Sequence, residues 1–120
     1  MEITSVEELN QLLIESNTRP VMLFKHSSEC PISSRALREF ESFIETAPDG
    51  LSCRLITVQT ARRVSDEAAS RLDVDHETPQ AILIRNGRSV WNASHFGITL
   101  DSLTEALQTC DFTTEKEPTA

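Results

Sequence analysis

Apolar residues recur along this chain at two spacings, one typical of helices and one typical of strands. Intervals of three or four residues, as at Val6, Leu9 and Leu13, place apolar side chains on one face of a helix. Short continuous apolar runs, such as residues 21–24, indicate buried strands instead. The first predicted element is a helix capped by Thr4 or Ser5 and ended by Pro20, and a strand over 21–24 follows it. A second helix is predicted to begin at Pro31 and to end before Pro48. A strand over 51–58 and a helix over about 65–74 come next.

The last third of the chain predicts a hairpin and a final helix. Asn86 and Gly87 form the dipeptide most typical of a two-residue hairpin turn, and apolar residues flank it on both sides. The elements expected here are a strand over 81–84, a return strand over 89–91 and a helix capped by Thr99 or Asp101.

The order of these elements indicates an α/β fold. Early alternation of helices and strands predicts right-handed crossovers with parallel pairing, and the hairpin adds an antiparallel edge. We therefore expect a thioredoxin-like three-layer sandwich, in which helices flank a four-stranded mixed sheet. The domain is expected to span residues 1–110. Residues 111–120 lack an apolar pattern and are expected to form a disordered acidic tail.

Length and charge narrow the class of protein. At 120 residues, with 38% hydrophobic and 25% charged residues, the chain suits one soluble globular domain. Its formal net charge of −8 disfavours nucleic acid and anionic membrane surfaces as partners. No apolar run approaches the ~18 residues of a membrane span, and the N-terminus lacks the pattern of a secretory signal. A cytoplasmic location is therefore expected.

Cys30 is the most informative of the three cysteines. An odd number of cysteines argues against a disulfide scaffold and fits a reducing compartment. Cys30 lies between the first strand and a helix that begins at Pro31, where backbone N–H groups and the helix dipole favour a thiolate. Ser33 occupies the position where a dithiol oxidoreductase carries a second cysteine. The pattern indicates a thiol-exchange site with one thiol; the alternative is a buried structural cysteine followed by an ordinary helix serine.

The residues around Cys30 are expected to act on its thiolate in opposite directions. Lys25 or a protonated His26 would favour the thiolate by charge, and the Ser33 hydroxyl would favour it by donating a hydrogen bond. The carboxylate of Glu29 works against them. The expected net effect is a modest stabilisation of the thiolate.

Three segments of the chain together resemble the monothiol bacilliredoxin family. They are residues 26–33, residues 76–81 and residues 86–95. The similarity covers about residues 3–108. It implies a thioredoxin-fold oxidoreductase that removes bacillithiol from protein mixed disulfides. Cys30 would be the attacking thiol, Ser33 would stand in place of a resolving cysteine, and Pro79 would be a cis-proline.

The resemblance also implies how substrates are held. The main chain of Thr78, directly before Pro79, would pair with an extended substrate. The substrate-binding residues expected are Lys25, His26, Pro31, Thr78 and Trp91. No bound cofactor or metal is expected, and a low-molecular-weight thiol such as bacillithiol would serve as cosubstrate. The expected partners are S-thiolated proteins and a disulfide reductase.

Other functions of the same residues remain open. A zinc site can be imagined among His26, Cys30, His76 and His95, but the usual paired ligand spacings are missing. The chain could instead be an iron–sulfur carrier similar to monothiol glutaredoxins. It could also be a non-enzymatic thioredoxin-fold module that binds partners without turnover.

The other two cysteines and the single tryptophan have simpler interpretations. Cys53 shares its strand alternation with apolar neighbours and is expected in the core. Cys110 is expected to be an incidental exposed cysteine, with a role as a distal resolving thiol as the alternative. Trp91 is either part of the thiol-binding surface or a half-buried residue of the hairpin.

Overall fold

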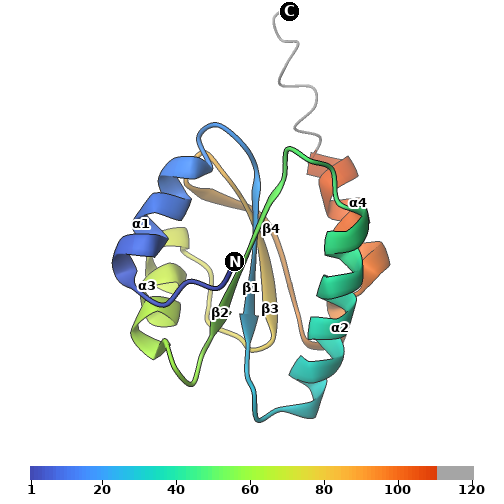
Figure 1. Ribbon diagram of the computed structural model, residues 1–120, viewed down its shortest axis with the longest axis horizontal. Helices are drawn as coiled ribbons and strands as arrows, with labels where there is room; N and C mark the ends of the chain where they lie inside the picture. The colour runs from blue at the N-terminus through green and yellow to red at the C-terminus, as the bar shows by residue number, and fades with distance from the viewer. Residues whose placement is uncertain (111–120) are drawn as a thin grey trace, which may run out of the picture.

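The computed structural model of the protein describes residues 1–110, and the predicted tail at 111–120 lies outside the described residues (Figure 1). The order of helices and strands is the predicted one, with one short 3-10 helix added. The elements are α1 (Val6–Glu15), β1 (Val21–His26), α2 (Pro31–Thr46), β2 (Ser52–Thr57), α3 (Arg62–Leu72), β3 (Gln80–Arg85), β4 (Arg88–Ser94), the 3-10 helix η1 (His95–Gly97) and α4 (Leu100–Cys110).

The strands form one mixed sheet in the order β2–β1–β3–β4. β1 pairs in parallel with β2 and antiparallel with β3, and β4 returns antiparallel beside β3. This is the four-stranded mixed sheet that the sequence predicts. The parallel pair is possible because α2 carries the chain back along the sheet between β1 and β2.

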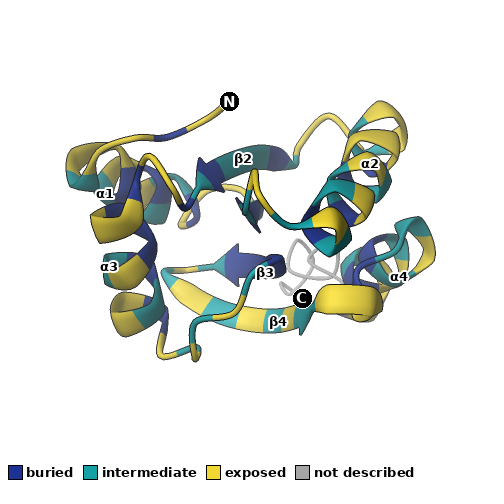
Figure 2. Ribbon diagram, turned by 90° about the horizontal axis from the view of Figure 1, so that it is seen from below, coloured by how far each residue is buried: buried dark blue, intermediate teal, exposed yellow. Residues whose placement is uncertain are grey.

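Helices cover both faces of the sheet. α1 and α3 lie on one face, and α2 and α4 lie on the other (Figure 1). Alternate residues of β1 point to opposite faces, so Leu23 packs in the α1–α3 core and Phe24 packs in the α2–α4 core. Figure 2 shows the buried residues on the inner sides of the helices and the exposed residues on their outer sides. The predicted three-layer α/β sandwich is confirmed.

Side-chain caps fix the starts of the first and last helices. The Glu8 N–H donates to Ser5 Oγ at 3.1 Å, so Ser5 rather than Thr4 is the N-cap of α1. At the start of α4, the Ser102 N–H donates to Thr99 Oγ1 at 3.0 Å. Thr99 therefore caps the last helix, as one of the two predicted alternatives.

The tip of the β3–β4 hairpin is attached to the end of α1. Asn86 and Gly87 have φ values of 56° and 73°, which Asn and Gly adopt with little strain. The Asn86 N–H donates to the Ser16 carbonyl at 2.8 Å, and the Gly87 N–H donates to Ser16 Oγ at 2.8 Å. Ser16 is fully buried, and its hydroxyl donates to the Leu13 carbonyl at 2.6 Å. Two hydrogen bonds to Ser16 thus hold the turn in place, and the third fixes the Ser16 side chain.

The third helix differs from the prediction at both ends. α3 begins at Arg62, three residues before the predicted start, and ends at Leu72. No side chain caps its start, so the usual signal is missing from the sequence. Val64 lies on the same buried stripe as Ala68 and Leu72, which extends the apolar face backwards. Asp73 then adopts a left-handed conformation that ends the helix.

The edges of the sheet are also longer than predicted. β4 continues to Ser94, three residues beyond the expected return strand. On the opposite edge, Glu2 bridges to Leu55 of β2, and the Ile3 N–H donates to the Leu55 carbonyl at 2.8 Å. Part of the β2 edge is therefore covered by the first residues of the chain. Within residues 1–110, no helix has the length and apolar character needed to cross a membrane.

Candidate active site

The junction between β1 and α2 places Cys30 at the start of a helix. Cys30 is the N-cap of α2, has an extended backbone and is partly exposed. Its carbonyl accepts the first helical hydrogen bond, from the Ser34 N–H at 3.1 Å. Pro31 follows at the first helical position, where its fixed φ suits a helix start, and it is exposed. Cys30 is thus a free thiol with the helix N-terminus beside it.

Ser33 makes different hydrogen bonds from those predicted. It is fully buried, and its Oγ accepts from the Ser27 N–H at 2.9 Å. The same oxygen lies 2.8 Å from His26 Nδ1. Among the described residues no hydrogen bond joins Ser33 to Cys30, so the expected bond from the serine hydroxyl to the sulfur is not formed. The serine instead faces the end of β1, where two partners are available.

The loop between β1 and Cys30 is held from two sides. On the inner side, Ser33 binds the N–H of Ser27, whose carbonyl accepts from the Cys30 N–H at 3.4 Å. On the outer side, Gln59 Nε2 donates to Ser27 Oγ at 2.7 Å, and Gln59 Oε1 accepts from the Ser28 N–H at 3.0 Å. Gln59 comes from the connection between β2 and α3. Nothing in its local sequence marks it, because its contacts depend on the pairing of β1 with β2.

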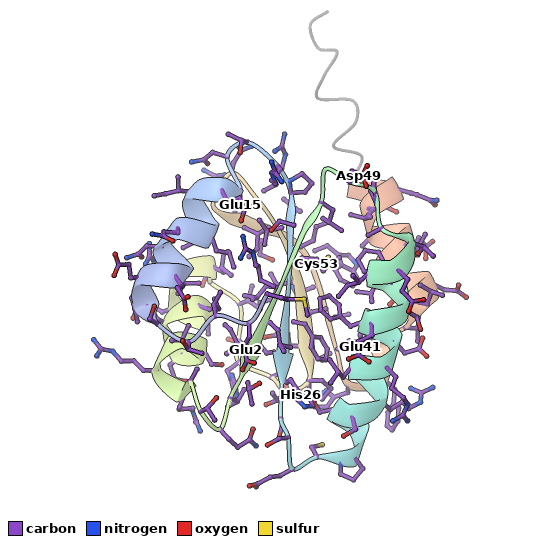
Figure 3. The ribbon with its side chains drawn as sticks, viewed as in Figure 1. Glu2, Glu15, His26, Glu41, Asp49 and Cys53 are labelled. Atoms are coloured by element: carbon purple, nitrogen blue, oxygen red, sulfur yellow. The ribbon has the colours of Figure 1, made fainter. Side chains whose placement is uncertain are left out.

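His26 lies on the same face of the sheet as α2. Its ring stacks on Phe24 with centroids 6.2 Å apart. Burial lowers the pKa of His26, and the carboxylates of Glu2 and Glu41 oppose this effect. Figure 3 labels these two carboxylates and His26, which lie towards the end of the sheet where β1 leads into α2. His26 is therefore placed between the N-terminal segment and α2.

Lys25 points to the opposite face of the sheet from His26. It is fully buried beside α3, and its Nζ has no hydrogen-bond partner among the described residues. Burial lowers the pKa of Lys25 to about 8, while the charges of Asp66 and Glu77 oppose the shift. The Lys25 side chain is not exposed at the surface in this position. Its predicted role in substrate binding stays a prediction.

The segment before β3 brings Pro79 to the same end of the sheet. The peptide bond between Thr78 and Pro79 is cis, as the resemblance implies. Lys25 and Gln80 are partners in the β1–β3 register, so Pro79 lies next to the end of β1 that precedes Cys30. Pro79 is buried, Thr78 is partly exposed, and the Pro79 carbonyl accepts from the His95 N–H at 3.0 Å.

Trp91 lies farther from this end of the sheet. It is half-buried opposite Leu83 and packs against the α2–α4 core. It is three residues before Ser94, which pairs with Gln80, a separation of ~10 Å along a strand. Trp91 is thus a half-buried residue of the hairpin, which is the simpler of its two interpretations. Its role in binding a thiol stays a prediction.

An exposed aromatic residue next to Pro79 was missed by the sequence analysis. Phe96, in η1, has 64% of its surface exposed. The guanidinium carbon of Arg35, in α2, lies 5.7 Å from the centre of its ring. Phe96 directly follows His95, whose N–H is hydrogen-bonded to the Pro79 carbonyl. Arg35 lies two residues after Ser33, so the pair connects η1 with the first turns of α2. The signal available in the sequence was a large apolar residue directly after the hairpin, outside any apolar pattern.

The second described cysteine is chemically different from Cys30. Cys53 packs against the α2–α4 core, and burial raises its pKa to about 11. It is partly buried at the margin of the core in which the sequence predicted it. The side chain of Cys110 lies outside the described part of the structure, and so do both predictions made for it. Among the side chains that are described, no group of three or more His, Cys, Asp or Glu is arranged to hold a metal ion.

These features define the class of protein. A mixed four-stranded sheet between two helical layers, with a cysteine at the start of α2, is the thioredoxin fold. Solved structures agree. A protein described as a candidate oxidoreductase with a thioredoxin fold is 35% identical, with a TM-score of 0.79 over 88% of this chain and 91% of that chain. The thioredoxin of Fasciola hepatica is 16% identical, with a TM-score of 0.71 over 90% of this chain and 96% of that chain.

The family within this class follows from the sequence match. The chain belongs to the monothiol bacilliredoxin BrxC family, whose model matches residues 1–103. The resemblance carried by residues 26–33, 76–81 and 86–95 is therefore confirmed. The match covers every element from the N-terminal segment to the start of α4.

Proposed function

We propose that this protein is a thiol–disulfide oxidoreductase that removes bacillithiol, or a similar low-molecular-weight thiol, from protein mixed disulfides. The observation that carries the proposal is Cys30, a partly exposed free thiol at the N-cap of α2. Ser33 stands one helical turn further on, where a second cysteine would be needed to close a disulfide. A protein with this arrangement exchanges thiols but depends on another molecule for resolution.

The reaction has two exchange steps. The Cys30 thiolate attacks the sulfur of the small thiol in a protein mixed disulfide. The bond between the two sulfurs breaks, the protein leaves as a thiolate, and Cys30 becomes disulfide-bonded to the small thiol. A second small thiol, as thiolate, then attacks the adduct, forms a small-thiol disulfide and releases the Cys30 thiolate. A disulfide reductase would regenerate the small thiol. No bound cofactor takes part.

The surroundings of Cys30 support a protein substrate. The main chain of Thr78, before Pro79, is suited to align an extended segment next to the attacking sulfur. Phe96 and Arg35 offer an exposed apolar and cationic surface at the same end of the molecule. The free thiols of Cys30 and Cys53 suit a reducing compartment, so we place the activity in the cytoplasm.

The test is release of bacillithiol from a model protein mixed disulfide. We expect Cys30→Ser to abolish release and Cys53→Ser, the matched control in the core, to leave it intact. Cys110→Ser is expected to behave like the control. Full activity of Cys30→Ser would overturn the proposal. Release that stops after one equivalent, despite excess small thiol and reductant, would indicate a binding module instead.

A further inference from the structure

Arg35 is an exposed cation of α2 whose usual partner within the helix is bound elsewhere. On a helix, an arginine pairs with acidic residues three or four positions away. Glu39, four residues after Arg35, is the acid at such a position in α2. Its Oε1 accepts instead from the Leu100 N–H at 2.7 Å, where α4 begins. Within residues 1–110, the Arg35 guanidinium therefore has neither a salt bridge nor a hydrogen bond.

Phe96 supplies the contact that Glu39 does not. The guanidinium carbon of Arg35 lies over the Phe96 ring, 5.7 Å from its centre. A cation at this distance from a ring face is attracted by the ring. The ring limits the positions that the Arg35 side chain adopts, but it offers no oxygen to the five N–H donors of the guanidinium. Arg35 is thus held in place while its N–H groups still lack an acceptor.

The Arg35–Phe96 pair lies beside both segments that flank the attacking sulfur. Arg35 follows Cys30 by five residues, a rise of ~7.5 Å along a helix. Phe96 directly follows His95, whose N–H donates to the Pro79 carbonyl at 3.0 Å. In an extended segment, residues two positions apart are separated by a similar distance, ~6.6 Å, and point to the same side. An extended substrate with its cysteine at Cys30 therefore brings the side chain two residues away to the pair.

We propose that the Arg35–Phe96 pair binds an acidic side chain of the protein substrate, two residues from its S-thiolated cysteine. The substrate carboxylate accepts two N–H bonds from the planar guanidinium, a geometry that arginine forms readily with carboxylates. The methylene groups of the same Asp or Glu cover part of Phe96, which is 64% exposed. The inference rests on the proposed function and adds which protein mixed disulfides are preferred.

The other charges at this end of the molecule make the preference depend on position. The protein has a net charge of −8, so an acidic substrate gains nothing from attraction at long range. Glu29, next to Cys30, and Glu77, before the cis peptide bond, are both exposed and repel a carboxylate placed near them. An acidic residue is therefore favourable where it reaches Arg35 and unfavourable elsewhere.

Matched peptides test this preference. Each peptide carries one cysteine in a mixed disulfide with bacillithiol, and either Glu or Gln two residues before or two residues after it. At one of the two positions we expect kcat/KM for bacillithiol release to be about three- to fivefold higher with Glu, the effect of one ion pair at a surface. Arg35→Gln should reduce release from that Glu peptide to the level of its Gln counterpart. Arg63→Gln, the same change of charge at an exposed position on α3, should keep the preference.

A second set of peptides separates a carboxylate of the protein from a carboxylate of the small thiol. In this set cysteamine, which has no carboxylate, replaces bacillithiol. The preference for Glu and its loss in Arg35→Gln are expected to persist. If Arg35→Gln slows the release of bacillithiol but not of cysteamine, whether the peptide carries Glu or Gln, the pair binds the small thiol and the proposal is wrong. Equal rates for the Glu and Gln peptides in the parent protein also overturn it.

A pyridyl disulfide of each peptide distinguishes failure of the proposed function from failure of this inference. In the full chain with Cys53→Ser and Cys110→Ser, the Cys30 thiolate attacks the peptide sulfur. Cys30 becomes disulfide-bonded to the peptide, and the pyridine thiolate leaves and takes up a proton, which gives an absorbance signal. If the proposed function fails, this rate still prefers Glu although no bacillithiol is released. If the rate is the same for Glu and Gln while bacillithiol is released normally, the acidic-residue site alone is refuted.

Discussion

At the scale of one residue, Lys25 shows that this fold buries an amine without a hydrogen-bond partner among the described residues. Its side chain is fully buried on the α3 side of β1, and its Nζ has no partner among residues 1–110. Asp66 and Glu77 act on it only at a distance, so burial prevails and lowers its pKa to about 8. The protonated amine therefore destabilises the fold at neutral pH.

Replacing this amine by an apolar group is expected to stabilise the protein. Lys25→Met has a similar volume and removes the buried charge, so the free energy of unfolding at pH 7 should rise by roughly 2 kcal/mol. Urea denaturation measures the change. Arg63→Met, at an exposed position on α3, is the control and should change it by less than about 0.5 kcal/mol. A destabilised Lys25→Met protein would show that the amine has a partner in solution.

The same residue predicts a pH dependence whose sign can be worked out. Between pH 8 and 10.5 the unfolded chain still binds the Lys25 proton, whereas the folded chain has lost it. Stability should therefore rise with pH from about 8 upwards, and this rise should be missing in Lys25→Met. Cys53 acts in the opposite direction from about pH 8 upwards, because its pKa is raised from 9.0 to about 11. Cys53 is present in both proteins, so the difference between their urea titrations isolates Lys25, and equal slopes in both proteins would contradict the assignment.

At the scale of elements, Ser16 shows how a turn predicted from two residues depends on a third. The Asn86–Gly87 signal located the hairpin correctly, but both turn N–H groups are bound by Ser16 at the end of α1. A local sequence pattern cannot report this contact, since 70 residues of chain separate the partners. The turn is thus fixed by tertiary structure as well as by its own conformational preference.

Removal of the Ser16 hydroxyl is expected to weaken the fold without touching the site. Ser16→Ala leaves the Gly87 N–H without its acceptor, so we expect the free energy of unfolding to fall by about 1–2 kcal/mol. Urea denaturation checks this, with Ser70→Ala on the exposed side of α3 as control. Alkylation of Cys30 should be unchanged, because Ser16 lies at the other end of β1. Slower alkylation of Cys30 together with an unchanged free energy of unfolding would contradict this view.

The elements that the sequence predicted less well lack local signals. α1 and α4 have side-chain caps, and in each case one of the two caps offered by the sequence, Ser5 and Thr99, is the one observed. α3 starts at Arg62 without a cap, so periodicity alone placed it three residues late. The N-terminal bridge to β2 has no periodicity, because it pairs through only a few backbone groups at an edge.

At the scale of the whole molecule, the site is assembled from segments that are distant in sequence. Cys30 comes from the β1–α2 junction, Pro79 from the start of β3 and Phe96 from η1. Motifs could predict the first two because each has a distinctive local sequence. The contacts of Gln59, the exposure of Phe96 and the orientation of Lys25 could not be predicted, because each depends on how the strands pair.

Phe96 gives a prediction at this scale. An exposed aromatic ring beside Pro79 can bury apolar surface against a protein substrate, whereas a small disulfide is too short to cover it. We expect Phe96→Ala to raise the KM for a protein mixed disulfide by about three- to tenfold and to leave the reaction with a small-thiol disulfide unchanged. Steady-state kinetics with both substrates measures the difference. Val90→Ala, another exposed apolar residue on β4, is the control. Equal losses for both substrates would contradict a docking role.

The attachment of the hairpin tip to Ser16 limits where this protein can be rebuilt as a redox sensor. Hairpin tips are a common choice for inserting a fluorescent domain, but insertion between Asn86 and Gly87 would break both bonds to Ser16 and release the β3–β4 pair that presents Pro79. The exposed turn at Asp49 and Gly50, after α2, has open space around it. A domain inserted there would leave the hairpin and Cys30 in place, so the α2–β2 turn is the better insertion site.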